Sequence, residues 1–239
     1  MFKKNDKTIV GSGFIAKYFN KYLKILKKYN YVVYAAGVSD SLSGNLNNFK
    51  KDVSRIKNYK LDKDKKIVYI SSYAVHDPSR KINRYIKNKI IIERVIKKKF
   101  DKYIILRFPE LIGKSKNKNT LSNFFYDKIK KKTDFNLWVN SKRNLLDVED
   151  AIKLSMYYLI KNKKNKIVFN ILNIKFYKPM TIVNTLERIL KRDANYKINN
   201  KHFKNWNLKN SVDYRIAKKL NIKFDKKYLF KKLKKYYLY

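Results

Sequence analysis

Short apolar runs alternate along the chain with longer stretches in which apolar residues recur at helical spacing. The apolar runs typical of buried strands cover residues 7–10, 31–37, 66–70, 103–107 and 166–173, with a further strand candidate at 136–140. The helical spacing predicts helices over residues 14–28, 47–57, 83–98, 120–131, 149–161, 181–191, 213–220 and 226–236. Strands that alternate with helices in this way indicate an α/β protein with a mainly parallel sheet.

Length and composition narrow the class of protein. A chain of 239 residues can form one sizeable core with a small additional lobe. No run approaches the roughly 20 apolar residues that span a bilayer, and glycines interrupt the apolar stretch near the N-terminus, so we expect no signal peptide. The absence of cysteine excludes disulfides and thiolate nucleophiles, and with two histidines we expect no metal site. These features predict a cytoplasmic protein.

The formal net charge of +42 taken alone suggests a nucleic-acid or membrane partner. However, only nine of the 60 basic residues are arginines, and the abundant lysine is accompanied by Asn, Ile and Tyr, which all have A/T-rich codons. The lysines are also spread from end to end. We therefore interpret most of the charge as nucleotide bias at surface positions, with a weak attraction for polyanions that includes phosphate-bearing substrates. Without a zinc-finger, helix-turn-helix or RNA-binding motif, we expect no specific nucleic-acid recognition.

A glycine-rich turn follows the first predicted strand. The residues from Gly11 to Ala16 form a G-x-G-x-x-A pattern between a strand and a helix, the context that indicates dinucleotide binding. Gly11 would permit a tight turn, Gly13 would let the backbone approach a pyrophosphate, and a small third residue would let helix and strand pack closely. The alternative interpretation is an ordinary turn between a strand and a helix.

A second candidate site begins where the predicted strand at 66–70 ends in Ser71 and Ser72. The next helix carries Tyr85 and Lys89, which are four residues apart and therefore project from the same face. An ammonium beside a phenol lowers the pKa of the phenol, so Tyr85 could exchange a proton near neutral pH. A serine hydroxyl from the strand end could bind the same substrate oxygen. This set of groups could transfer a proton while another group transfers a hydride.

The spacing Tyr-x-x-x-Lys is weak evidence by itself, because the composition repeats it. It also occurs at Tyr59, Tyr126, Tyr157, Tyr214 and Tyr228, where we interpret it as a solvated helix face. Tyr85 alone follows an apolar strand that ends in Ser-Ser, with the glycine-rich turn upstream.

The order of these segments resembles the extended short-chain dehydrogenase/reductase family, the NAD-dependent epimerase/dehydratase group that acts on nucleotide sugars. The resemblance rests on residues 10–16, 35–36, 69–76, 85–89 with Glu93, 106–113, 143–150 and 212–214 with Leu220. It implies a Rossmann-like doubly wound parallel sheet, shortened in its N-terminal half, with a small C-terminal substrate-binding lobe. The implied boundaries are 1–112 with 144–174 for the NAD(P)-binding domain and 113–143 with 175–239 for the lobe.

The resemblance also implies a role for each matching residue. The catalytic set would be Ser72, Tyr85 and Lys89, of which Lys89 would also hold the nicotinamide ribose of NAD or NADP. The residues near the cofactor would be Gly11, Gly13, Phe14, Ile15, Ala36, Ser71, Tyr85, Lys89 and Pro109. The substrate nucleotide would contact Thr120 and Arg143, together with Ser72 at the sugar. The alternative for Arg143 is a surface salt bridge.

Three departures from the family pattern limit what the resemblance implies. Only one strand fits between the opening helix and Ala35-Ala36, where the family has two more, and no acidic residue for the adenine ribose is evident. The choice between NAD and NADP therefore stays open. The interval from Ser72 to Tyr85 is short. Ser72 is followed by Tyr73 and Ala74 in place of the Asp-Glu pair of the 4,6-dehydratases, which disfavours dehydration and, without a second acid/base pair, 3,5-epimerisation.

These observations predict an NAD(P)-dependent oxidoreductase or epimerase that acts on a nucleotide-activated sugar, with a role in surface polysaccharide synthesis that only the resemblance implies. The alternative is a catalytically silent Rossmann-type protein that binds a dinucleotide or a nucleotide sugar. A homodimer through the helix that carries Tyr85 is compatible with the apolar residues 90–92, which could equally belong to the core.

Overall fold

The computed structural model describes residues 7–40, 45–76, 83–201 and 210–238. The chain divides into two compact units, which are considered separately. The first is formed by Met1–His76, Ile82–Phe108 and Ser155–Asn170, and the second by Pro109–Leu154 and Ile171–Tyr239. Residues 109–112, 144–154 and 171–174 thus lie in the second unit, whereas the predicted boundaries assigned them to the cofactor domain. The roles predicted for the two parts stay predictions.

The first unit is built on a parallel sheet. Its described strands are β1 (Ile9–Val10), β2 (Tyr31–Tyr34), β3 (Lys66–Ser72), β4 (Tyr103–Phe108) and β8 (Lys166–Asn170), in the spatial order β1-β2-β3-β4-β8. Every neighbouring pair is parallel, and the register places Ser72 at the end of β3 beside Phe108 at the end of β4. The predicted α/β class with a mainly parallel sheet is confirmed.

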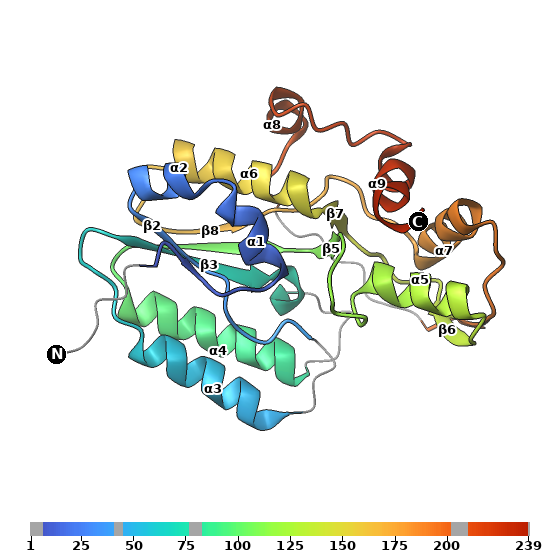
Figure 1. The fold of residues 1–239 in the computed structure, drawn as a ribbon, viewed down its shortest axis with the longest axis horizontal. Coiled ribbons are helices and arrows are strands. Elements are labelled where there is room, and N and C mark those ends of the chain that lie inside the picture. The colour runs from blue at the N-terminus through green and yellow to red at the C-terminus, as the bar shows by residue number, and fades with distance from the viewer. Residues whose placement is uncertain (1–6, 41–44, 77–82, 202–209, 239) are drawn as a thin grey trace. The chain divides into compact units, whose positions relative to one another are not determined.

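Helices cover both faces of this sheet (Figure 1). The helices are α1 (Phe14–Asn20), α2 (Leu23–Lys28), α3 (Leu46–Asn58), α4 (Arg84–Lys99) and the C-terminal half of α6 (Val148–Lys161). Helices α3 and α4 pack on one face, where Ile56, Ile92 and Ile96 join Val32 and Tyr69 in the core. Helices α1, α2 and α6 lie on the other face (Figure 1).

One helix was predicted wrongly as continuous. The expected helix over residues 14–28 is interrupted at Lys21–Tyr22, where the Tyr22 N–H donates to the Phe19 carbonyl three residues back. This contracted turn separates α1 from α2, and both pieces still bury a large apolar side chain completely, Phe19 and Leu26.

The strand order follows the chain order and never reverses. Within residues 7–34, only the helices α1 and α2 lie between β1 and β2. This confirms that only one strand follows the opening helix before Ala35. The connections β2–α3–β3 and β3–α4–β4 step across the sheet in one direction with their helices on one face. The connection from β1 to β2 moves in the same direction across the sheet, but its helices lie on the opposite face (Figure 1). The handedness of this crossover is therefore opposite to that of the other two. The described sheet therefore lacks the reversal of strand order at which doubly wound sheets bind ligands.

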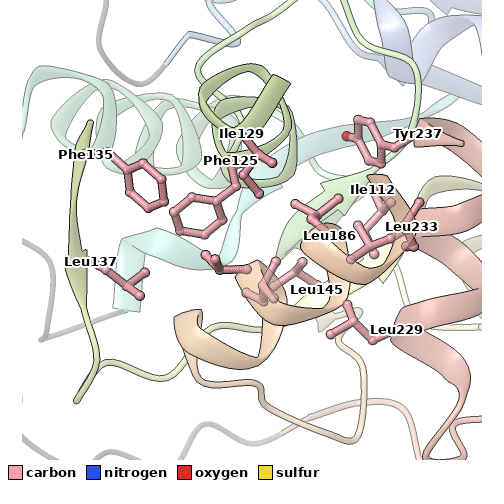
Figure 2. Packing of buried hydrophobic residues seen from close by; sticks show 13 residues of the cluster. Ile112, Phe125, Ile129, Phe135, Leu137, Leu145, Leu186, Leu229, Leu233 and Tyr237 are labelled. Carbon is pink, nitrogen blue, oxygen red and sulfur yellow. The ribbon is translucent and has the colours of Figure 1, made fainter. Parts of the chain in front are cut away.

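The second unit contains two short parallel pairs and four helices in its described part. Strands β5 (Glu110–Ile112) and β7 (Leu145–Asp147) pair, as do β6 (Phe135–Trp138) and β9 (Tyr196–Asn199). The helices are α5 (Leu121–Lys131), α7 (Pro179–Leu190), α8 (Tyr214–Lys219) and α9 (Tyr228–Tyr237), besides the start of α6. Figure 2 shows the core between them, in which Phe125 and Phe135 face one another and Leu186 packs beside Leu233. Its buried residues come from β5, β6, β7, α5, α7 and α9, so this unit has a core of its own.

Candidate active site

The glycine-rich turn places its two glycines in different surroundings. Gly11 has a φ of +118°, and a Cβ there would lie 2.8 Å from the backbone of Ala35 and Ala36 at the end of β2. Gly13 is extended, and a Cβ there would meet nothing within 4 Å. Gly11 is thus required by the close approach of β1 to β2. Gly13 leaves an uncovered stretch of backbone just before Phe14 and Ile15 open α1, and such a surface fits a pyrophosphate.

Lys89 is the most constrained residue of the predicted catalytic set. Its side chain is buried, and Nζ donates to the Ile70 carbonyl of β3 at 3.2 Å. The same Nζ lies 5.7 Å from the centre of the Tyr85 ring and 5.1 Å from that of Tyr69. Burial acts to lower the pKa of Lys89, but Tyr69, Tyr85 and the Asp52 carboxylate outweigh it, so that this pKa lies above its ordinary value. Lys89 is therefore a buried ammonium beside the Tyr85 ring.

A buried polar network fastens α4 to the sheet one turn beyond Lys89. Glu93 accepts from the Ser71 hydroxyl at 2.6 Å and from Arg107 on β4 at 2.9 and 2.6 Å. Burial acts to raise the pKa of Glu93, but the hydrogen bonds from Arg107 and Ser71 hold it below its usual value. Together with the bond from Lys89 to Ile70, this network aligns the start of α4 with the end of β3. The Ser71 hydroxyl is engaged inside the fold, so its predicted cofactor contact would have to come from its backbone.

Ser72 is the last residue of β3 and is half-buried. Its hydroxyl oxygen accepts from the Ala74 N–H at 3.2 Å, which leaves the hydroxyl hydrogen to donate to a bound oxygen. The short helix η1 (Tyr73–His76) follows at once and buries Tyr73 and Ala74. Burial and the nearby Arg107 lower the pKa of His76. Part of the short interval between Ser72 and Tyr85, residues 77–82, lies outside the described residues.

Two buried carboxylates near the site were not among the site residues predicted from the sequence. Asp52 of α3 is buried, and its Oδ2 accepts from the Val38 N–H at 2.6 Å, just beyond the end of β2. Glu93 is the other, since the sequence marked it only as part of a family resemblance. A signal was present, because Asp52 lies on the apolar stripe formed by Phe49 and Ile56 of the same helix. A carboxylate at such a position must find a buried partner.

The predicted residues Pro109, Thr120 and Arg143 belong to the second unit. Pro109 separates β4 from β5, and Thr120 precedes α5 with its hydroxyl 3.4 Å from the Asn117 carbonyl. The Arg143 guanidinium is largely buried and lies 4.0 Å from a Glu110 carboxylate oxygen. A substrate contact by any of the three stays a prediction.

Comparison with known proteins identifies solved structures with a similar fold. No family model matches the chain, and no curated protein matches its sequence. Among solved structures, a UDP-N-acetylglucosamine 4-epimerase from Bacillus cereus matches with a TM-score of 0.64 at 18% identity, over 95% of this chain and 96% of that one. RMD from Pseudomonas aeruginosa, complexed with NADPH, matches with a TM-score of 0.64 at 15% identity, over 95% of both chains. A UDP-glucuronic acid 4-epimerase from Bacillus cereus, in complex with NAD, matches with a TM-score of 0.63 at 17% identity, over 90% of this chain and 75% of that one.

At these identities the likeness defines the fold. The chain has the Rossmann-like α/β fold of the extended short-chain dehydrogenases/reductases, the fold used by NAD-dependent nucleotide-sugar epimerases and dehydratases. The fold class predicted from the sequence is confirmed. Within the described residues, no helix has the length and apolar character needed to cross a membrane.

Proposed function

We propose that this protein is an NAD(P)-dependent oxidoreductase or epimerase that acts on a nucleotide-activated sugar. The observation that carries the proposal is the buried Lys89 ammonium, which is held by the Ile70 carbonyl and lies 5.7 Å from the Tyr85 ring centre. Ile70 lies two residues before Ser72, the serine that would contact the same substrate. The solved structures with the same fold that were crystallised with NAD or NADPH add support.

In the proposed reaction the proton moves through Tyr85. Its phenolate would take the proton from a sugar hydroxyl during oxidation and return it during reduction, while the Lys89 ammonium stabilises the ionised phenol. Ser72 would donate its hydroxyl hydrogen to the same sugar oxygen and so fix the orientation of the sugar. The bound nicotinamide supplies or accepts the hydride.

The residues of the first unit fit such a cofactor in part. The open backbone at Gly13 suits a pyrophosphate, and the Lys89 ammonium suits a ribose hydroxyl. Dehydration is disfavoured because the two residues after Ser72 are Tyr73 and Ala74, both buried and neither a carboxylic acid. Keto-sugar reduction or epimerisation is therefore the favoured reaction, and surface polysaccharide synthesis is the role we propose for it.

Substitution of Tyr85 by Phe tests this mechanism. We expect turnover to fall by about 10²–10⁴-fold, the usual contribution of general acid–base catalysis. Tyr126→Phe is the matched control, because Tyr126 has a lysine at the same spacing and the same distance. Turnover would be followed with NADH and NADPH on UDP- and dTDP-linked keto-sugars and by analysis of epimerised sugars. Full turnover by Tyr85→Phe would refute the mechanism.

One observation favours a second candidate, a silent binding protein. The described sheet has β1 at its edge and no reversal of strand order, so it has no strand beyond β1 that could contact the adenosine half of a dinucleotide. Titration with NADH and NADPH, with and without UDP or dTDP, separates the oxidoreductase from a silent protein that binds the nucleotide sugar, and the Tyr85→Phe assay separates it from one that binds a dinucleotide. Micromolar binding of either dinucleotide supports the oxidoreductase, whereas binding of the nucleotide alone supports the silent protein.

A further inference from the structure

The loops at the amino ends and at the carboxyl ends of the strands in the first unit's sheet differ sharply in charge; these two sides are called here the amino edge and the carboxyl edge. The turns that enter β2, β3, β4 and β8 lie at the amino edge, on the left in Figure 1. These turns, residues 27–30, 57–66, 97–102 and 161–166, contain 15 lysines, three aspartates and no arginine. The described loops at the opposite, carboxyl edge, residues 11–13, 35–40 and 73–76, contain one aspartate and no lysine or arginine. The first four residues of α1, α3 and α4, which follow these loops, add Lys17, Arg84 and Lys87, so the two edges still differ when helix ends are included and codon bias alone does not account for the difference.

Hydrogen bonds connect the four turns: the backbone N–H of Lys66 donates to the Asn30 carbonyl at 2.9 Å, and three lysine side chains link the other turns. Lys66 Nζ donates to the Lys164 carbonyl at 2.9 Å, and Lys102 Nζ donates to the Lys63 carbonyl at 3.1 Å. Lys99 Nζ donates to the carbonyl of Lys57. These bonds link the turn that enters β3 to the turns that enter β4 and β8, so the remaining lysines project from an ordered face. Burial, with a smaller contribution from the nearby Lys102, lowers the pKa of Lys66.

Helix dipoles account for only some of these lysines. Helices α2, α3, α4 and α6 all end at this edge, and cations in a last helical turn are stabilised by the dipole. However, Lys60, Lys63, Lys163 and Lys164 lie beyond the helix ends, where that effect fades. The surface is therefore more basic than the fold requires.

Two exposed apolar side chains stand at one corner of this surface. Tyr29 is 41% exposed and Ile160 is 37% exposed. Tyr31 lies between them in the chain of contacts, because the Tyr29 ring stacks on Tyr31 at 6.3 Å and the Tyr31 hydroxyl donates to the carbonyl of Leu159, the residue before Ile160. Apolar and aromatic side chains beside lysines gain energy at a bilayer surface but little from a nucleic-acid backbone. The absence of arginine from these turns also removes the side chain best suited to reading bases.

We infer that the amino edge of this sheet, formed by residues 27–30, 57–66, 97–102 and 161–166 with Ile160, is a docking surface for an anionic lipid bilayer. Its lysines attract the headgroups, and Tyr29 and Ile160 enter the interface. The proposed catalytic residues belong to the opposite edge of the sheet, so docking leaves them facing away from the bilayer.

Co-sedimentation of the full chain with vesicles tests this inference. We expect binding to phosphatidylcholine vesicles that contain phosphatidylglycerol, no binding to pure phosphatidylcholine, and release as salt rises. The edge variant replaces one exposed lysine in each turn by glutamine, at Lys28, Lys63, Lys98 and Lys163. The control variant replaces four exposed lysines of the second unit by glutamine, at Lys153, Lys197, Lys218 and Lys223. Both variants lose the same net charge.

The expected result is at least about a tenfold loss of vesicle affinity in the edge variant and less than about a twofold loss in the control. Equal losses in the two variants would mean a diffuse charge effect and would overturn the inference. A second variant, Tyr29→Ser with Ile160→Ser, should weaken vesicle binding several-fold while leaving the weak binding of duplex DNA unchanged. Tighter binding to DNA than to anionic vesicles, lost only in the edge variant, would identify a nucleic-acid surface instead and would also overturn it.

Discussion

The pairs Tyr85–Lys89 on α4 and Tyr126–Lys130 on α5 have the same spacing in sequence and the same 5.7 Å between lysine Nζ and ring centre. Their surroundings differ. Lys89 is buried and donates to the carbonyl of a central strand, whereas Lys130 is exposed and reaches only the Tyr126 hydroxyl, at 3.4 Å. An ammonium screened by water stabilises a phenolate far less than a buried one does. Local geometry alone therefore does not make a proton-transfer site.

A third pair, Tyr228–Lys232 on α9, shows the opposite failing. Its tyrosine is buried, its lysine is half-buried, and Lys232 Nζ lies 5.4 Å from the ring centre. However, the Tyr228 hydroxyl donates to Asp150 at 2.9 Å and accepts from the Asp147 N–H at 3.0 Å, so both its donor and an acceptor position are taken. Burial and the Asp150 carboxylate raise its pKa well above the ordinary value. Of the three pairs, Tyr85–Lys89 combines a buried lysine with a hydroxyl that no such bond engages among the described residues.

The largest expected effect separates Lys89 from Lys130. Lys89→Met should lower turnover by about 100-fold or more, because the phenolate loses its buried counter-charge. The Ile70 carbonyl also loses its side-chain donor, which should cost about 1–3 kcal/mol of unfolding free energy. Lys130→Met should leave turnover unchanged and alter stability by less than about 0.5 kcal/mol. Steady-state kinetics and urea unfolding of both variants check this, and equal effects would remove the distinction between the helices.

A second comparison concerns the carboxylates of the same two helices. Glu93→Gln on α4 leaves the Arg107 guanidinium buried with a neutral partner, and we expect it to cost about 3–5 kcal/mol of unfolding free energy. Asp127→Asn on α5 breaks an exposed ion pair with Lys131, 2.8 Å long, and should cost less than about 0.5 kcal/mol. Denaturant unfolding of the wild type and the two variants measures the loss of unfolding free energy at each position. A cost at Glu93 as small as that at Asp127 would show that the network does not hold α4.

For the third pair we expect an effect on stability without one on chemistry. Tyr228→Phe removes a donor to Asp150 and an acceptor for the Asp147 N–H, which should lower the free energy of unfolding by about 1–3 kcal/mol. Turnover per folded molecule should stay at the wild-type value. A large loss of turnover at a temperature where the variant is folded would instead assign Tyr228 a part in the reaction.

The smallest effect is a pH dependence that belongs to Glu93. Its pKa in the folded protein lies below the ordinary value of 4.5, so its stabilising contribution is complete above about pH 4.5 and is lost as pH falls through the lowered pKa. The difference in unfolding free energy between wild type and Glu93→Gln should therefore be constant near neutral pH and shrink below pH 4.5. Acid unfolding series on both proteins measure it. A difference that grows on acidification would contradict a lowered pKa for Glu93 in the folded protein.

Most of the first unit could be predicted from the sequence, because long apolar runs and helical stripes determine its strands and helices. Strands β5, β7 and β9 could not, since three or four residues carry too little periodicity and their pairing partners are distant in sequence. At the site, the turn at Gly11 and the juxtaposition of Tyr85 with Lys89 follow from local spacing. The burial of Lys89 does not, because it depends on the Ile70 carbonyl nineteen residues away. The burial of the Glu93 carboxylate likewise depends on Arg107, which lies on strand β4.

The order of strands in the first unit also bears on how the chain acquires its structure. From β1 to β4 each new strand pairs with the one just before it in the chain, so every pairing closes only one intervening segment. Such pairings cost little loop-closure entropy and favour fast folding. Strand β8 is the exception, since it must reach β4 across residues 109–165. We therefore expect residues 7–108 to form a four-stranded intermediate as they leave the ribosome, with β8 completing the sheet only after residues 109–165 have been synthesised.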